Sequence, residues 1–197
     1  MKILIKYLFL FIIFLNIGCS GKEDKDISVL LSTDLDQQMS EVYREGLEAY
    51  KKEDFLLAAK KFNEAELLYP QSEWAAKSSL MAAYSYYTDG YYNDSIFQLE
   101  QFVKLYPTNP RISYAHYLLA MSYYSKIIDQ KKDIKPLLES KNKFQFIVNK
   151  YPNSEYALDS KFKLDLIEET LASKEMFVAK HYIKKEKWIP AINRLKF

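Results

Sequence analysis

The stretch FLLAAKKFNEAELLYP, residues 55–70, decides the fold of this chain. Its apolar residues recur every three or four positions, as on one face of an amphipathic helix, and Pro70 ends that helix because proline cannot continue it. Two further helical patterns end in the same dipeptide, at Tyr106-Pro107 and Tyr151-Pro152, so the three prolines are 37 and 45 residues apart. Repetition at this period predicts an all-α solenoid in which pairs of antiparallel helices stack on one another.

Helix-start signals lie between these patterns. Asp54 and Ser72 are residue types that cap helix N-termini, and Asn109-Pro110 combines a capping residue with proline in the first turn. A lysine-rich loop over 129–135 accounts for the longer second interval. The first helices of the pairs are expected over about 40–52, 74–88, 111–128 and 155–185, and the second helices after Asp54, after Gly90, at Pro136 and near Lys187.

These positions resemble the tetratricopeptide repeat, in which small residues let the two helices of a unit touch and a large residue wedges between units. The resemblance divides a repeat domain over 39–197 into units at about 39–72, 73–109, 110–153 and 154–197, the last one incomplete. The motif residues are Gly46, Ala58, Phe62, Ala65 and Pro70 in the first unit, Ala83, Tyr86, Ser95, Leu99 and Pro107 in the second, and Ala120, Tyr123, Ser140, Phe144 and Pro152 in the third.

The composition argues against catalytic and nucleic-acid-binding classes. Four glycines in 197 residues exclude a glycine-rich phosphate loop, and 28 basic against 26 acidic residues give no electrostatic footprint for nucleic acid. His116 and His181 have no cysteine or carboxylate at a metal-ligand spacing, and no nucleophile elbow or HExxH motif is present. We therefore expect a protein that is not an enzyme and needs no metal or cofactor.

The N-terminal residues predict export and a lipid anchor. Two lysines precede an apolar run over 7–15, which is too short to span a bilayer and is typical of a signal peptide over 1–18. Cys19, the one cysteine of the chain, resembles the lipid-attachment residue of bacterial lipoproteins, although Asn16 stands where that pattern has an aliphatic residue. This predicts a lipidated tether over 19–38. The alternative is an ordinary secretory signal with an incidental cysteine.

By the same resemblance, the first helix of each repeat lines a concave groove. Carrying over the groove-facing positions gives twelve residues, seven of them tyrosine, a side chain that suits adaptable peptide contacts. The alternative is that several of these rings pack between helices. The two lysines among the candidates are predicted to pair with a carboxylate or a chain terminus, or else are solvated. Nine of the twelve are singled out as peptide-binding candidates, leaving aside Leu47, Leu80 and Met121: Tyr43, Tyr50, Lys51, Lys77, Tyr84, Tyr87, Tyr114, Tyr117 and Tyr124.

The later part of the chain resembles one family more specifically. There, a Tyr-Pro-Asn-Ser sequence at 151–154 is followed by a Val-Ala pair, a tyrosine, a tryptophan and an Asn-Arg pair. This series is similar to that of the BamD family, the lipoproteins of the outer-membrane β-barrel assembly machinery. The residues that carry the resemblance after the Tyr-Pro are Val178, Ala179, Tyr182, Trp188, Ala191, Asn193 and Arg194.

The BamD resemblance implies a lipid-anchored protein on the periplasmic face of the outer membrane. Its front units would engage unfolded outer-membrane proteins or their C-terminal aromatic signals. Its rear units would dock on the periplasmic domains of BamA and on other subunits of the machinery. The docking residues would be Tyr182, Trp188, Asn193 and Arg194.

The last predicted repeat unit is incomplete. The chain stops at Phe197 in the middle of a helix, before the family's fifth repeat, so we expect a truncated form or a short form whose partner covers that edge.

One rival function is another periplasmic repeat scaffold, serving cell-envelope or division complexes. The other is a peptidoglycan-active enzyme with the repeats as an accessory. No residue or motif of the sequence supports this alternative.

Overall fold

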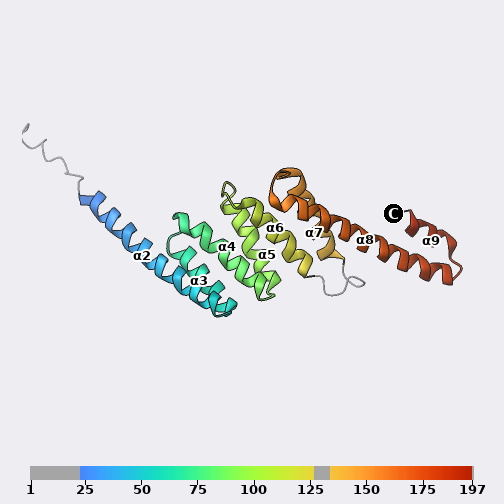
Figure 1. Ribbon diagram of the computed structural model, residues 1–197, viewed down its shortest axis with the longest axis horizontal. Coiled ribbons are helices and arrows are strands. Elements are labelled where there is room, and N and C mark those ends of the chain that lie inside the picture. The colour runs from blue at the N-terminus through green and yellow to red at the C-terminus, as the bar shows by residue number, and fades with distance from the viewer. Residues whose placement is uncertain (1–22, 127–133, 197) are drawn as a thin grey trace, which may run out of the picture. The chain divides into compact units, whose positions relative to one another are not determined.

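The structure, a computed structural model, describes residues 23–126 and 134–196. Within these ranges the chain forms eight helices and no strand, which confirms the predicted all-α fold. Residues 39–197 form one compact unit, in which each helix lies beside the next in sequence, as in a tetratricopeptide solenoid (Figure 1). The helices are α2 (Glu23–Lys51), α3 (Phe55–Leu68), α4 (Glu73–Thr88), α5 (Tyr92–Leu105), α6 (Ile112–Ser125), α7 (Lys135–Lys150), α8 (Glu155–Lys184) and α9 (Trp188–Leu195).

Two of the predicted helix caps are formed. The Asp54 carboxylate accepts a hydrogen bond from the backbone N–H of Leu57, and the Ser72 hydroxyl accepts one from that of Ala75, both at 3.1 Å. Each bond satisfies one of the N–H groups that a helix leaves unpaired at its start. The turn between α4 and α5 contains Gly90 with a φ of 79°, a conformation that glycine adopts without strain. These local signals explain why the helix starts are readable from the sequence.

The first described helix begins earlier than expected. α2 starts at Glu23 rather than near residue 40, so residues 23–38, predicted as part of a tether, are helical. No proline or glycine interrupts the sequence between Glu23 and Gly46, and acidic residues in the first turn favour a helix start. Most of the predicted loop over 129–135 lies outside the described residues, and α7 carries Pro136 in its first turn as expected.

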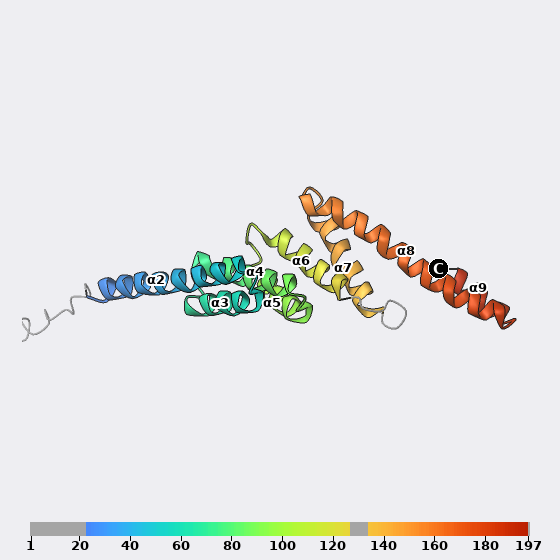
Figure 2. The same cartoon turned by 60° about the horizontal axis from the view of Figure 1, so that its bottom comes forward.

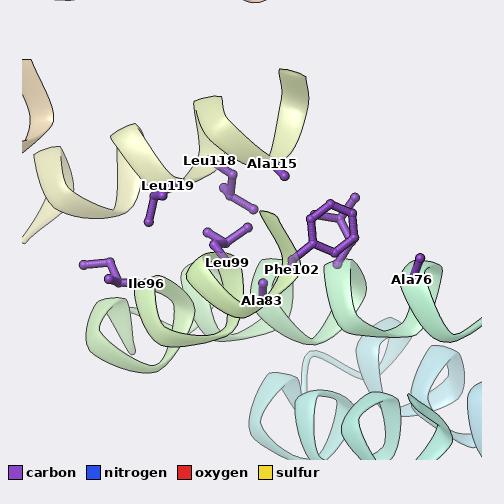
Figure 3. Packing of buried hydrophobic residues seen from close by; sticks show 9 residues of the cluster. Ala76, Ala83, Ile96, Leu99, Phe102, Ala115, Leu118 and Leu119 are labelled. Atoms are coloured by element: carbon purple, nitrogen blue, oxygen red, sulfur yellow. The ribbon is translucent and has the colours of Figure 1, made fainter. Parts of the chain in front are cut away.

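Buried phenylalanines join the successive helices. Phe62, Phe102 and Phe144 lie in the second helices of the first three pairs, and none of the three has an exposed side chain. Phe102 points toward a cluster that α4, α5 and α6 share, with Leu99 and Leu118 among its members (Figure 3). Removal of this apolar surface from water is the main stabilising contribution to the stack.

A polar network also links the first two repeats. The Glu66 carboxylate on α3 accepts hydrogen bonds from the Tyr106 hydroxyl at 3.1 Å and from Nε2 of Gln98 at 3.0 Å. The same Gln98 amide donates to the Ser79 hydroxyl on α4 at 3.0 Å. Burial raises the pKa of Glu66, and the three hydrogen-bonding neighbours oppose that rise. The network therefore ties α3 to both helices of the following unit through a satisfied, part-buried carboxyl group.

Candidate functional site

A cleft of about 510 Å³ lies where the first helices of three successive repeats meet. α4 contacts α6, and α6 contacts α8, so side chains from three separate stretches of sequence face one space. The volume falls within the range of about 300–1,000 Å³ that is usual for ligand pockets. The lining residues are Lys77, Leu80, Met81 and Tyr84 from α4, Pro110 and Arg111 before α6, Ser113 and Tyr114 from α6, and Glu155 and Tyr156 from α8.

One wall of the cleft is made of tyrosine rings. The ring of Tyr156 lies 5.5 Å from that of Tyr114 and 5.1 Å from that of Tyr117, measured between centroids. Tyr84 stacks on Tyr50 of α2 at 5.9 Å. Such pairs hold the rings in place, because an offset or tilted aromatic pair contributes more stabilisation than the burial of the two rings alone. The wall is therefore apolar and preorganised, with hydroxyl groups at its edges.

The tyrosine hydroxyls of this wall remain protonated at neutral pH. Burial raises the pKa of Tyr114, and that of Tyr117 rises through burial and then through its hydrogen bond to Asp159, whose Oδ2 lies 2.6 Å away. The pKa of Tyr84 is raised by hydrogen bonding to Tyr50 and by burial. A ligand in the cleft therefore meets neutral rings and hydroxyl groups rather than phenolates.

The charges of the cleft lie on three residues. Nζ of Lys77 lies 4.4 Å from the ring centroid of Trp74 and 5.0 Å from that of Tyr43, so this ammonium group rests over aromatic faces. Arg111, which directly precedes α6, is exposed. Glu155, the first residue of α8, is also exposed and supplies the one acidic group of the lining. Two cations and one carboxylate favour an anionic group in the ligand.

The structure brings together only some of the predicted groove residues. Lys77, Tyr84 and Tyr114 line the cleft. Tyr50 and Tyr117 support its wall from behind through their ring contacts. These five residues therefore form one connected set.

The other predicted groove residues lie elsewhere. Tyr43 is 6% exposed and packs between Phe62 and Trp74, so it belongs to the core. Lys51 is exposed at the last residue of α2 and does not line the cleft. Tyr87 packs on Tyr92 with ring centroids 5.7 Å apart, and Tyr124 packs on Phe144 at 6.3 Å and lies under Nζ of Lys163 at 5.4 Å.

Besides Met81, Pro110 and Ser113, sequence reasoning missed three charged or aromatic residues of the cleft, namely Arg111, Glu155 and Tyr156. All three stand at the start of the first helix of a repeat unit. The groove-facing positions, in contrast, were assigned from the resemblance in the first three units only. The signal that could have found them is the helix start itself, since Asn109-Pro110 and Ser154 mark the first turns of α6 and α8. Parallel helices in one layer bring their first turns to one edge, where these residues meet.

Comparison with known proteins decides the class of protein. A family model described as YfiO, outer membrane lipoprotein, matches residues 35–197. An outer membrane protein assembly factor BamD from Rickettsia prowazekii is 36% identical over 177 residues, which cover 90% of this chain and 68% of that relative. The chain belongs to the YfiO/BamD family.

Other YfiO/BamD relatives carry the same name. One from Caulobacter vibrioides is 33% identical over 179 residues, covering 91% of this chain and 57% of the relative. One from Neisseria gonorrhoeae is 30% identical over 186 residues, covering 89% of this chain and 68% of the relative. The chain thus spans between 57% and 68% of the length of these three relatives.

Membership of the YfiO/BamD family fixes the broad class of function. Its named members are assembly factors, that is, scaffolds rather than enzymes, and this chain is accordingly not an enzyme. The same membership associates the chain with the outer membrane of the bacterial envelope. In the part of the chain that the structure describes, no helix is long and apolar enough to cross a membrane. Cys19, the predicted lipid-attachment residue, lies outside the described residues.

The residues predicted for partner docking gather at α8 and α9, which lie side by side (Figure 2). Tyr182, Asn193 and Arg194 line a second cleft, of about 430 Å³, together with Glu175 and Pro190. Nη1 of Arg194 forms an ion pair with Oε2 of Glu175 at 3.1 Å. The side chain of Trp188, at the start of α9, is 59% exposed. Tryptophan, tyrosine and arginine are residue types that are enriched at protein interfaces.

Proposed function

We propose that this chain is a lipoprotein subunit of the outer-membrane β-barrel assembly machinery, acting as a non-catalytic scaffold. In this proposal the concave cleft of α4, α6 and α8 binds segments of unfolded outer-membrane proteins. The docking residues on α8 and α9 bind the periplasmic domains of BamA, alongside other subunits. The relatives named as outer membrane protein assembly factors support a role in outer-membrane protein assembly. The two clefts are the candidate surfaces for binding the substrates and the other subunits.

The observation that carries the substrate role is the composition of the concave cleft. A neutral tyrosine wall with two cations at its rim suits an extended peptide that bears aromatic side chains and a carboxylate. The contacts hold only a short segment at a time, and tyrosine binds many partners at a low cost in side-chain entropy. An assembly factor that receives many different unfolded chains needs this kind of tolerant recognition.

The test is recovery of partners from the envelope. The full chain, tagged at its C-terminus, is produced in its own bacterium, crosslinked in intact cells and purified, and the partners are identified by mass spectrometry. We expect BamA and unfolded outer-membrane proteins among the partners. The variant Trp188→Ala should lose BamA while keeping the substrates, because the exposed ring lies on α9 and not in the concave cleft. Recovery of cell-wall or division proteins without BamA would instead support another periplasmic scaffold.

The proposed membrane anchor rests on Cys19. We expect Cys19→Ala to move the protein from the membrane fraction to the soluble periplasmic fraction, or to leave the precursor unprocessed, because the thiol that would carry the lipid is gone. Fractionation and the intact mass of the mature protein provide the measurement, and Cys19→Ser serves as a second thiol-free variant. Ser20, rather than aspartate, follows the cysteine, so we expect sorting to the outer membrane. Membrane attachment and mass unchanged in both variants would refute the lipid anchor.

A further inference from the structure

We propose that His116 is a pH-sensitive latch between the two helices of the third repeat unit. The latch is closed while the imidazole ring is neutral, and it opens when the ring takes up a proton from water. The sequence gives His116 no metal-binding partner, and its side chain does not line the concave cleft. The latch goes beyond the proposed function, because it concerns how the repeats hold together and not what they bind.

The latch consists of three aromatic rings that contact one another. The His116 ring, on α6, lies 4.7 Å from the ring of Phe146 and 5.8 Å from that of Tyr151, measured between centroids. The rings of Phe146 and Tyr151 are 6.0 Å apart. Tyr151 ends α7, where its backbone N–H donates a hydrogen bond to the carbonyl oxygen of Ile147 at 2.8 Å. The cluster therefore fastens the first half of α6 to the last turn of α7.

The surroundings of the His116 ring favour its neutral form. Burial of the ring and the positive charge of Lys143, on α7, lower its pKa. The helices α4, α5 and α8 also pack against α6. Among the residues that the structure describes, no charged group of these three helices contributes to the change in pKa, and Tyr151 is the other titratable group of the cluster. An imidazolium at this place would be partly desolvated and would face an ammonium group.

Acid should therefore open the contact between α6 and α7. A histidine whose pKa is lower in the folded chain than in the unfolded chain stabilises the fold above the unfolded value of about 6.5. This stabilisation is lost as the pH falls through the folded value. The proton can reach the cluster from solvent, because the side chain of Phe146 is 41% exposed.

Opening of the latch would affect the whole stack, because α6 and α7 lie between the front and the rear helices (Figure 1). α5 packs on α6, and α7 packs on α8. In a repeat array, each unit is held mainly by its nearest neighbours. The latch thus couples the first two repeat units to α8 and α9, and a fall in pH weakens that coupling.

The first measurement is the protonation of the ring itself, by NMR titration of the full chain with labelled histidines. The sequence has two histidines, so the variant His181→Gln leaves the signal of His116 alone. We expect the His116 ring to titrate at a lower pH than histidine in an unfolded peptide. Lys143→Gln should shift this titration to higher pH, because it removes the repelling charge.

The second measurement is hydrogen exchange of the backbone amides, compared at about pH 7.5 and about pH 5.5, on either side of the usual histidine pKa. After correction for the pH dependence of exchange itself, α6 and α7 should lose protection in acid. His116→Gln and His116→Phe should abolish this loss, since neither new side chain takes up a proton in this range. The matched control is His181→Gln, which removes an exposed histidine on α8 and should keep the loss.

Two outcomes would overturn the latch. One is a loss of protection in acid that persists in both His116 variants. The other is titration of the His116 ring at or above the pH found in an unfolded peptide, since attraction of an imidazolium to the rings of Phe146 and Tyr151 would then outweigh burial and repulsion. The ring titration uses the unmodified residue at position 116, so it decides the matter even where a His116 variant fails to fold.

Discussion

Replacing Phe62 with alanine should lower the free energy of unfolding by about 3–5 kcal/mol. The ring is fully buried in α3 and lies 5.2 Å from the ring of Tyr43 on α2. It also fills the space that Gly46 leaves open, since a Cβ atom at position 46 would stand 2.8 Å from the phenylalanine ring. Truncation would therefore leave a cavity between two helices that are shaped to this side chain. In an array of nearest-neighbour contacts, the loss should extend beyond one repeat.

Thermal and urea unfolding followed by circular dichroism measure this effect. The matched control is Leu67→Ala on the same helix, where the leucine is 76% exposed and the change should stay within about 0.5 kcal/mol. The broad loss of helix in Phe62→Ala should accompany a lower midpoint in both experiments. A melting temperature within a degree of the parent protein would contradict the assignment of Phe62 as a wedge between helices.

The fold is readable from this sequence because its determinants are local and repeated. Capping residues such as Asp54 and Ser72, the helix-ending Tyr-Pro pairs and the buried phenylalanines all act within one helix or between neighbours. Repetition then multiplies each weak signal. The start of α2 was missed because these signals are absent there: residues 23–38 carry neither a repeat motif nor a helix-breaking residue that would mark a boundary.

The cleft was only partly predictable, because it depends on the packing of three helices. Periodicity shows which residues of a helix share a face, and three of the residues that it selects, Lys77, Tyr84 and Tyr114, line one cleft. It does not show whether a ring on that face points into the groove or between helices, which is why buried Tyr43 was included. Nor does it bring Arg111 next to Tyr156, which lies 45 residues away in sequence and in the next repeat.

Replacing both Tyr84 and Tyr156 with alanine should weaken binding of a peptide with a C-terminal phenylalanine by well over tenfold. These rings stand on opposite helices of the cleft, α4 and α8, and an aromatic anchor in such a site typically contributes about 2 kcal/mol or more. Tyr87, although predicted for the same groove, packs on Tyr92 and should contribute less. The measurement is titration of the labelled peptide, with circular dichroism and a melting curve to confirm that the variant is folded.

The control for this pair is Tyr91→Ala, which removes a tyrosine that is 47% exposed just before α5 and outside the cleft lining. Tyr84→Ala alone provides a milder variant, since Tyr156 also supports Tyr114 and Tyr117 through ring contacts. Unchanged affinity in a folded double variant would place the peptide site outside this cleft.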